Sequence, residues 1–111
     1  MKLIYVAGPY RAPSEWQVTL NIREAEAAAL ELWRMGYAVI CPHKNTAYFG
    51  GAAPDQVWLD GDMEMLRRCD AVYAMPSWKK STGATAEISE ARRLGIPVFE
   101  TLDECQLHVN K

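Results

Sequence analysis

Short apolar runs and amphipathic stretches alternate along the whole chain. Four continuous apolar runs stand at Leu3–Ala7, Tyr37–Cys41, Ala71–Met75 and Ile96–Phe99. Such runs are typical of parallel strands that are covered on both faces. Pro97 removes one hydrogen-bond donor from the last run, which favours an edge strand or the first residues of a strand. The pattern predicts a mostly parallel sheet of about four to five strands.

Apolar positions between these runs recur at helical spacing. They predict helices from Ser14 to about Met35, from Trp58 to Arg68, from Ser81 to Gly95 and, shorter, from Asp103 to Val109. Ser14, with Gln17 three residues later, and Ser81 are good N-caps. Gly36 and Gly95 are typical of the residue just past a helix end. Ala84, Ile88, Ala91 and Leu94 form the expected inner face of the third helix.

The stretch from His43 to Val57 has no clear period and holds two glycines and a proline. A connection of this length in a small domain is usually a functional loop or lid. His43, Asn45 and Tyr48 are its candidate ligand-facing residues, although His43 taken alone fits a structural role somewhat better. One histidine without companions does not make a metal site, because catalytic zinc sites need about three protein ligands.

Strands that alternate with helices predict a single α/β domain over residues 1–111, with a Rossmann-like (flavodoxin-like) doubly wound parallel sheet. Right-handed crossovers favour the strand order 2-1-3-4. Ligands of such sheets bind where the strand order reverses, here between strands 1 and 3. That crevice is expected to collect Gly8, Pro9 and Tyr10 after the first strand, Asp62, the segment Ser81–Gly83 and Glu87.

Charge and cysteine content argue against a nucleic-acid-binding protein and against a disulfide-rich or zinc-binding protein. The net charge is −2, and basic residues form only short pairs such as Lys79-Lys80, so a nucleic-acid footprint is not expected. Three widely spaced cysteines without a Cys-x-x-Cys pair argue against a disulfide framework or a zinc site and fit a reducing cytoplasm. The apolar run Leu3–Ala7 is too short for a signal or a membrane span.

Two carboxylates fall on inward faces of predicted helices. Glu87 lies three residues after Ala84 and four before Ala91, and Asp62 shares a face with Leu66. A buried carboxylate is costly without a partner or a task, although Asp62 is also explained as a helix-start acid favoured by the dipole. Two carboxyl groups in one pocket fit cleavage of a glycosidic bond. The helix start at Ser81–Gly83 suits a phosphate.

Other polar and aromatic positions leave two interpretations open. Asn21, beside the inner stripe of the first helix, is either a ligand contact or a surface residue. The Gly8-Pro9 turn either forms part of the wall of a ligand site or is a plain turn. Four tryptophans, Trp16, Trp33, Trp58 and Trp78, are compatible with a pocket or an interface, but large aromatic residues are more often core.

The chain resembles the nucleoside 2-deoxyribosyltransferase-like superfamily, and within it the small DUF4406-type members related to deoxynucleoside 5′-monophosphate N-glycosidases. The resemblance covers residue 3 to about residue 99 and rests on the order and spacing of several weak motifs. These are Ile4–Tyr10, Asn21, Cys41–Thr46, Asp62 eight residues before Asp70, and Ser81-x-Gly83 followed by Glu87.

The resemblance implies a glutamate nucleophile at Glu87, an aspartate at Asp62 that assists the base, and a phosphate held by Ser81 and Gly83. It also implies a small-molecule nucleoside or nucleotide as ligand, no cofactor or metal, and a homodimer or larger homo-oligomer whose neighbouring subunits complete each site. Arg11 is a candidate phosphate contact, because the Gly8–Tyr10 turn differs from the Ser-Ile-Arg type of the nucleotide hydrolases.

Departures from the family pattern keep other activities open. Ala86 stands where relatives often carry an aromatic residue, so stacking of that residue on the sugar is not expected. The chain is also shorter at its C-terminus than the transferases, where partner-donated residues often lie, so hydrolysis is expected over transfer. A module that binds a nucleotide without cleaving it is the main alternative. A ribonucleotide phosphoribohydrolase is another, although Gly83 is a single glycine where that signature has more. A receiver domain is disfavoured, because no paired acids follow the first strand.

Overall fold

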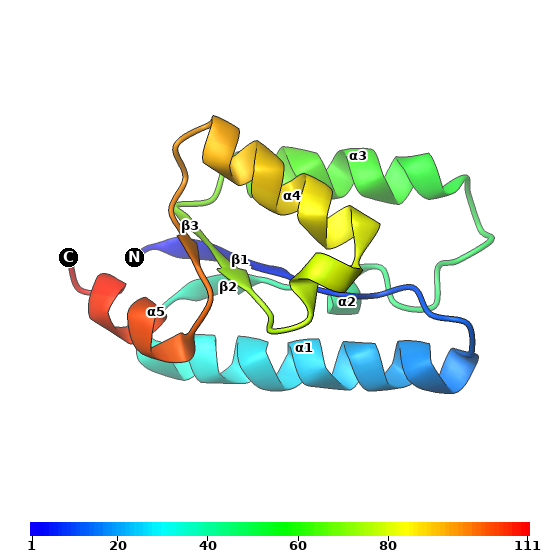
Figure 1. Cartoon of the computed structure of the whole chain (residues 1–111), viewed down its shortest axis with the longest axis horizontal. Helices are drawn as coiled ribbons and strands as arrows, with labels where there is room; N and C mark the ends of the chain where they lie inside the picture. Colours follow the sequence, from blue (N-terminus) through cyan, green and yellow to red (C-terminus); the bar gives the residue numbers. More distant parts are fainter.

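A computed structural model describes all residues 1–111 as one α/β domain built on a four-stranded parallel sheet (Figure 1). Its strands are β1 (Leu3–Ala7), β2 (Ala38–Ile40), β3 (Ala71–Ala74) and β4 (Val98–Phe99), in the order β2-β1-β3-β4. All pairs are parallel, and β1 sits between β2 and β3 with Tyr5 opposite Ile40 and Val72. The predicted fold class and strand order are confirmed.

Helices cover both faces of the sheet. They are α1 (Glu15–Met35), α2 (Pro42–Asn45), α3 (Asp55–Leu66), α4 (Thr82–Arg93) and α5 (Leu102–His108), with a 3-10 turn η1 (Trp78–Lys80) before α4. Figure 1 shows α1 and α5 on one face and α3 and α4 on the other. Alternate β1 side chains therefore enter different cores: Ile4 and Val6 pack toward α1, and Tyr5 and Ala7 pack toward α3 and α4.

The helix ends follow the expected capping chemistry. The Ser14 hydroxyl accepts a hydrogen bond from the Gln17 N–H at 3.1 Å, and the Ser81 hydroxyl accepts one from the Ala84 N–H at 3.1 Å. Gly36 ends α1 in the left-handed region at φ 107°, where a residue with a Cβ is strained. Local sequence therefore sets where α1 and α4 begin.

Several expected boundaries are corrected. The stretch 43–57 is not a continuous loop, because α2 occupies its first residues and α3 begins at Asp55, three residues before the predicted start. Pro42 ends β2 and also opens α2, since its fixed φ suits the first helical position. The fourth strand contains only Val98 and Phe99 of the predicted run.

Burial also differs from expectation at large apolar residues. Leu94 lies past the end of α4 and is 42% exposed, so it does not complete the inner face of that helix. Trp16 and Trp33 on α1 are 69% and 52% exposed, whereas Trp78 is buried, so only part of the tryptophan set belongs to the core. No helix of the structure combines the length and the apolar character needed to cross a membrane.

Candidate active site

A cavity of about 760 Å³ opens at the carboxyl ends of β1 and β3, where the strand order reverses. Its walls come from the segment after β1, the region after β2, the helix α3, and the start of α4. Nine of the residues singled out in the sequence line it: Gly8, Pro9, Tyr10, Arg11, His43, Asp62, Ser81, Gly83 and Glu87. The predicted convergence at the switch point is thus present in the fold.

Three candidate ligand-facing residues, Asn21, Asn45 and Tyr48, do not line this cavity, and Tyr48 is 81% exposed. Asn21 is buried in α1, where its side-chain oxygen accepts from Gln17 at 3.0 Å and its amide nitrogen donates to the Tyr10 carbonyl at 3.0 Å. Asn21 therefore holds the segment after β1 in place. Asn45 lines a separate, open groove of about 470 Å³ beside the edge strand β2, together with Trp33.

Glu87 projects from α4 into the cavity, beneath the helix start. Burial raises the pKa of Glu87 to about 7, a hydrogen bond donated by the Tyr5 hydroxyl opposes this rise, and the nearby Asp62 adds to it. A carboxyl group with this pKa changes its charge near neutrality. Such perturbed groups in a cleft are candidates for catalysis.

Tyr5 is a site residue that the sequence motifs missed. It is fully buried on β1, and its hydroxyl donates to Glu87 Oε2. Burial, followed by the Glu87 and Asp62 charges, raises the pKa of the Tyr5 hydroxyl far above its ordinary range, so it remains a donor. The alternation of side chains along a strand could have identified Tyr5 from the sequence. Tyr5 and Ala7 point to the same face of the sheet, and α4 covers that face.

Asp62 faces the same cavity from α3, which packs beside α4. Burial raises the pKa of Asp62 to about 6. Because the Asp62 charge also raises the pKa of Glu87, the two carboxyl groups interact across the cavity. The arrangement provides two acids of similar strength on neighbouring helices. No group of three or more His, Cys, Asp or Glu side chains is placed to hold a metal ion.

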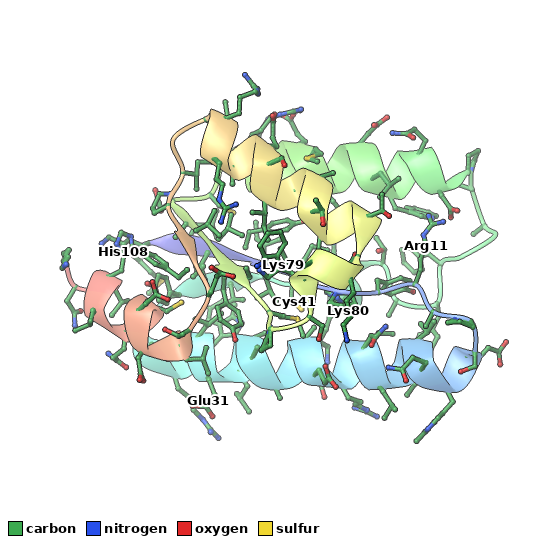
Figure 2. All side chains as sticks on the ribbon, viewed as in Figure 1. Arg11, Glu31, Cys41, Lys79, Lys80 and His108 are labelled. Carbon is green, nitrogen blue, oxygen red and sulfur yellow. The ribbon has the colours of Figure 1, made fainter.

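The start of α4, one turn before Glu87, offers groups that can bind a polar or anionic ligand. The first turn of α4 leaves N–H groups without helical partners, and the space at Gly83 is open, the nearest atom to an added Cβ being Ser81 Oγ at 3.9 Å. Figure 2 shows Lys80 at the end of η1 and Arg11 near the start of α3. Arg11 pairs with Asp55 at 2.9 Å, so Lys80 is the lining cation without a carboxylate partner.

His43 closes the cavity on the β2 side. Its Nε2 lies 2.9 Å from the Pro9 carbonyl oxygen, and its ring meets the Tyr10 ring edge-on at a centroid distance of 5.9 Å. Burial lowers the pKa of His43, and this outweighs the Pro9 and Gly8 carbonyl groups, which favour the charged ring. A neutral His43 that donates from Nε2 keeps a lone pair on Nδ1.

Replacing Gly8 by alanine is expected to destabilise the fold by about 1–3 kcal/mol, because a Cβ there would overlap the Met75 side chain. Met75 is buried, and its Cβ and Cγ would both lie 3.0 Å from the added atom. Urea unfolding checks this. Gly83→Ala is the matched control on the other wall and should be neutral or slightly stabilising, because the site is open and helical. Equal effects of the two substitutions would contradict the steric argument.

Residues 2–100 match the profile of a family described as a domain of unknown function, DUF4406. A comparison with curated protein sequences finds no match. Solved structures share the fold. A 2-deoxyribosyltransferase from the psychrotolerant bacterium Bacillus psychrosaccharolyticus superposes with a TM-score of 0.66 at 22% identity, over 86% of this chain and 69% of that one.

Two further structures give the same picture. A 2-deoxyribosyltransferase from Leishmania mexicana has a TM-score of 0.65 at 20% identity, over 88% of this chain and 62% of that one. A conserved protein from Enterococcus faecalis V583 has a TM-score of 0.62 at 22% identity, over 88% of this chain and 61% of that one. The chain thus spans 61–69% of the length of these structures, and likeness at this identity establishes the shared fold.

Proposed function

This chain belongs to the DUF4406 family, and from its transferase-like fold and paired carboxyl groups we propose that it breaks the N-glycosidic bond of a (deoxy)nucleoside or its 5′-monophosphate. The observation that carries the proposal is the convergence of Glu87 and Asp62 on one cavity, each with a raised pKa. Acid–base and nucleophilic carboxyl pairs are what glycosidic cleavage requires.

In the proposed first step, a Glu87 carboxylate oxygen attacks the anomeric carbon. The C–N bond breaks, its electron pair moves onto the base, and the Asp62 carboxyl group gives a proton to a base nitrogen or oxygen. The products are a glycosyl ester on Glu87 and a neutral free base. Tyr5 orients Glu87 through the hydroxyl hydrogen bond, which favours the charged carboxylate before attack.

In the second step, the Asp62 carboxylate takes a proton from an incoming nucleophile, which attacks the anomeric carbon and releases Glu87. Water as nucleophile gives hydrolysis, and a nitrogen of a second base gives transfer. The first turn of α4 and Lys80 are placed to bind a 5′-phosphate, because N–H groups at a helix start favour anions. This places the sugar over Glu87 and the base on the side of α3 and His43.

A bell-shaped pH profile of kcat/KM is expected, with its maximum between the pKa values of about 6 for Asp62 and about 7 for Glu87. Activity needs Glu87 charged and Asp62 protonated, so it falls on the acid side as Glu87 gains a proton and on the alkaline side as Asp62 loses one. Because Glu87 has the higher pKa, this reactive form is the minor one of the two singly protonated forms, and the two limbs report the pair. Tyr5→Phe removes the hydrogen bond that lowers the Glu87 pKa, so the maximum should move to higher pH and become lower. An unchanged profile in that variant would exclude Tyr5 from this role.

Chromatographic detection of free base tests the function. Purified protein is incubated with matched ribo- and deoxyribonucleosides and with their 5′-monophosphates. Base release would support the proposal and identify whether the 2′-hydroxyl and the phosphate matter. Release only from ribonucleotides would favour a phosphoribohydrolase. Thermal stabilisation by a nucleotide without any release over long incubation would replace the proposal with a non-catalytic binding module.

A further inference from the structure

Two buried side-chain polar atoms in the whole chain lack a hydrogen-bond partner, His43 Nδ1 and Trp58 Nε1. Both residues line the same cavity. Buried polar groups are nearly always paired, and an exception calls for a reason such as a ligand. The coincidence of both exceptions at one cavity points to a group that is absent from the free protein.

The two atoms have opposite hydrogen-bonding character. Trp58 Nε1 carries a hydrogen and can only donate. His43 donates from Nε2 to the Pro9 carbonyl, so its Nδ1 can only accept. A complementary ligand presents an acceptor and an N–H donor. Planar nitrogen heterocycles carry such an edge, whereas sugars and phosphates do not present it in a plane.

The position of Trp58 on α3 also suits contact with the same ligand group as Asp62. It stands one helical turn before Asp62, so the two side chains share a face of the helix. The Trp58 ring packs against Phe49 at a centroid distance of 5.6 Å, which holds the indole against the loop between α2 and α3. Trp58 and Asp62 therefore both border the cavity from α3, with the indole N–H just beneath its surface.

We propose that Trp58 and His43 recognise the leaving group, with the Trp58 N–H donating to a ring nitrogen of a nucleobase and His43 Nδ1 accepting from one of its N–H groups. This inference rests on the proposed function, because it assigns the base to the α3 side of the cavity. It makes Trp58 a specificity-determining residue that no sequence motif indicated.

Binding of isosteric ligands tests the proposal without turnover. Dissociation constants are measured by calorimetry in a Glu87→Gln background for nucleosides and for deaza analogues, in which one ring nitrogen acceptor is replaced by C–H. One analogue in the series should bind about 10- to 100-fold more weakly than its parent, because it leaves the Trp58 N–H unpaired. In Trp58→Phe, which keeps an aromatic ring, parent and analogue should bind equally.

Trp33→Phe is the matched control, because Trp33 is half-exposed on α1 outside this cavity. It should retain the full discrimination between parent and analogue. The readout is a ratio measured in one preparation, so a partly unfolded variant does not change it. His43 is tested separately with ligands dimethylated at an exocyclic amine, which has no N–H left to donate, and the resulting penalty should disappear in His43→Leu.

The outcomes separate this inference from the proposed function. Discrimination that depends on Trp58 in a protein that releases no base would support base recognition and overturn cleavage. Base release with discrimination that survives in Trp58→Phe would support cleavage and overturn the assignment of Trp58. Equal binding of every parent and analogue by the Trp58-containing protein would also overturn it.

Discussion

Replacing Glu87 by glutamine is expected to abolish base release and, above pH 7, to make the folded protein more stable. Glutamine keeps the shape and still accepts from the Tyr5 hydroxyl, but it cannot form the glycosyl ester. A lost nucleophile should reduce kcat by at least about 10³-fold, since the two-step route disappears. The chromatographic base-release assay measures this directly.

The stability effect follows from the raised pKa of Glu87. In the unfolded chain the ordinary pKa is 4.5, and burial raises the folded value to about 7. Between these pH values the folded state binds the extra proton, so wild-type stability falls as pH rises through this window. Glutamine has no such penalty. The free energy of unfolding of Glu87→Gln should equal that of wild type below about pH 4.5 and exceed it by about 3 kcal/mol above pH 7.

Glu90→Gln provides the matched control on the same helix. Arg93 and Arg67 hold the pKa of Glu90 at about 2, so its charge stabilises the fold above pH 4.5 and loses that effect as pH falls toward 2. Its replacement should therefore lower stability at neutral pH and leave base release unchanged. Urea unfolding at pH 5 and pH 8 compares both variants. A Glu87→Gln protein that is less stable than wild type at pH 8 would contradict the burial argument.

The sheet was predicted correctly from the sequence because the pattern of apolar runs and helices is compatible with few arrangements of the strands. The central strands β1 and β3 are buried, and right-handed crossovers leave few possible strand orders, so β2-β1-β3-β4 followed. The inward placement of Glu87 and Asp62 followed from helical periodicity on α4 and α3 in the same way. Boundaries were less accurate at α2, where Pro42 both ends a strand and starts a helix.

Contacts between distant residues could not be read from local pattern. The hydrogen bond from Tyr5 to Glu87 joins residues 82 positions apart and depends on how α4 packs over β1. Asn21 shows the opposite case. Its position beside the inner stripe left a ligand contact and a surface residue open, yet it is buried and its amide group is paired with the Tyr10 carbonyl and Gln17. Trp58 drew attention only as an aromatic residue, since an unpaired N–H is visible only in the packed structure.

Replacing Asp62 by asparagine should cost most where the leaving base most needs a proton. An asparagine amide cannot supply that proton, so kcat/KM for unmodified bases should fall by about 10²–10⁴-fold. A substrate whose base is already cationic through ring methylation needs no proton transfer and should be cleaved at nearly the wild-type rate. The alkaline limb of the pH profile, which the proposal attributes to loss of the Asp62 proton, should disappear in the variant.

The control for Asp62 is Glu64→Gln, the same chemical change on an exposed part of α3 where Glu64 pairs with Arg68. It should leave rate and pH profile unchanged. Burial makes Asp62 a stronger base and a weaker acid than an ordinary aspartate, which suits a group that must give a proton in one step and take one back in the next. A uniform loss across neutral and cationic bases, with the alkaline limb retained, would mean that Asp62 positions the substrate and another group transfers the proton.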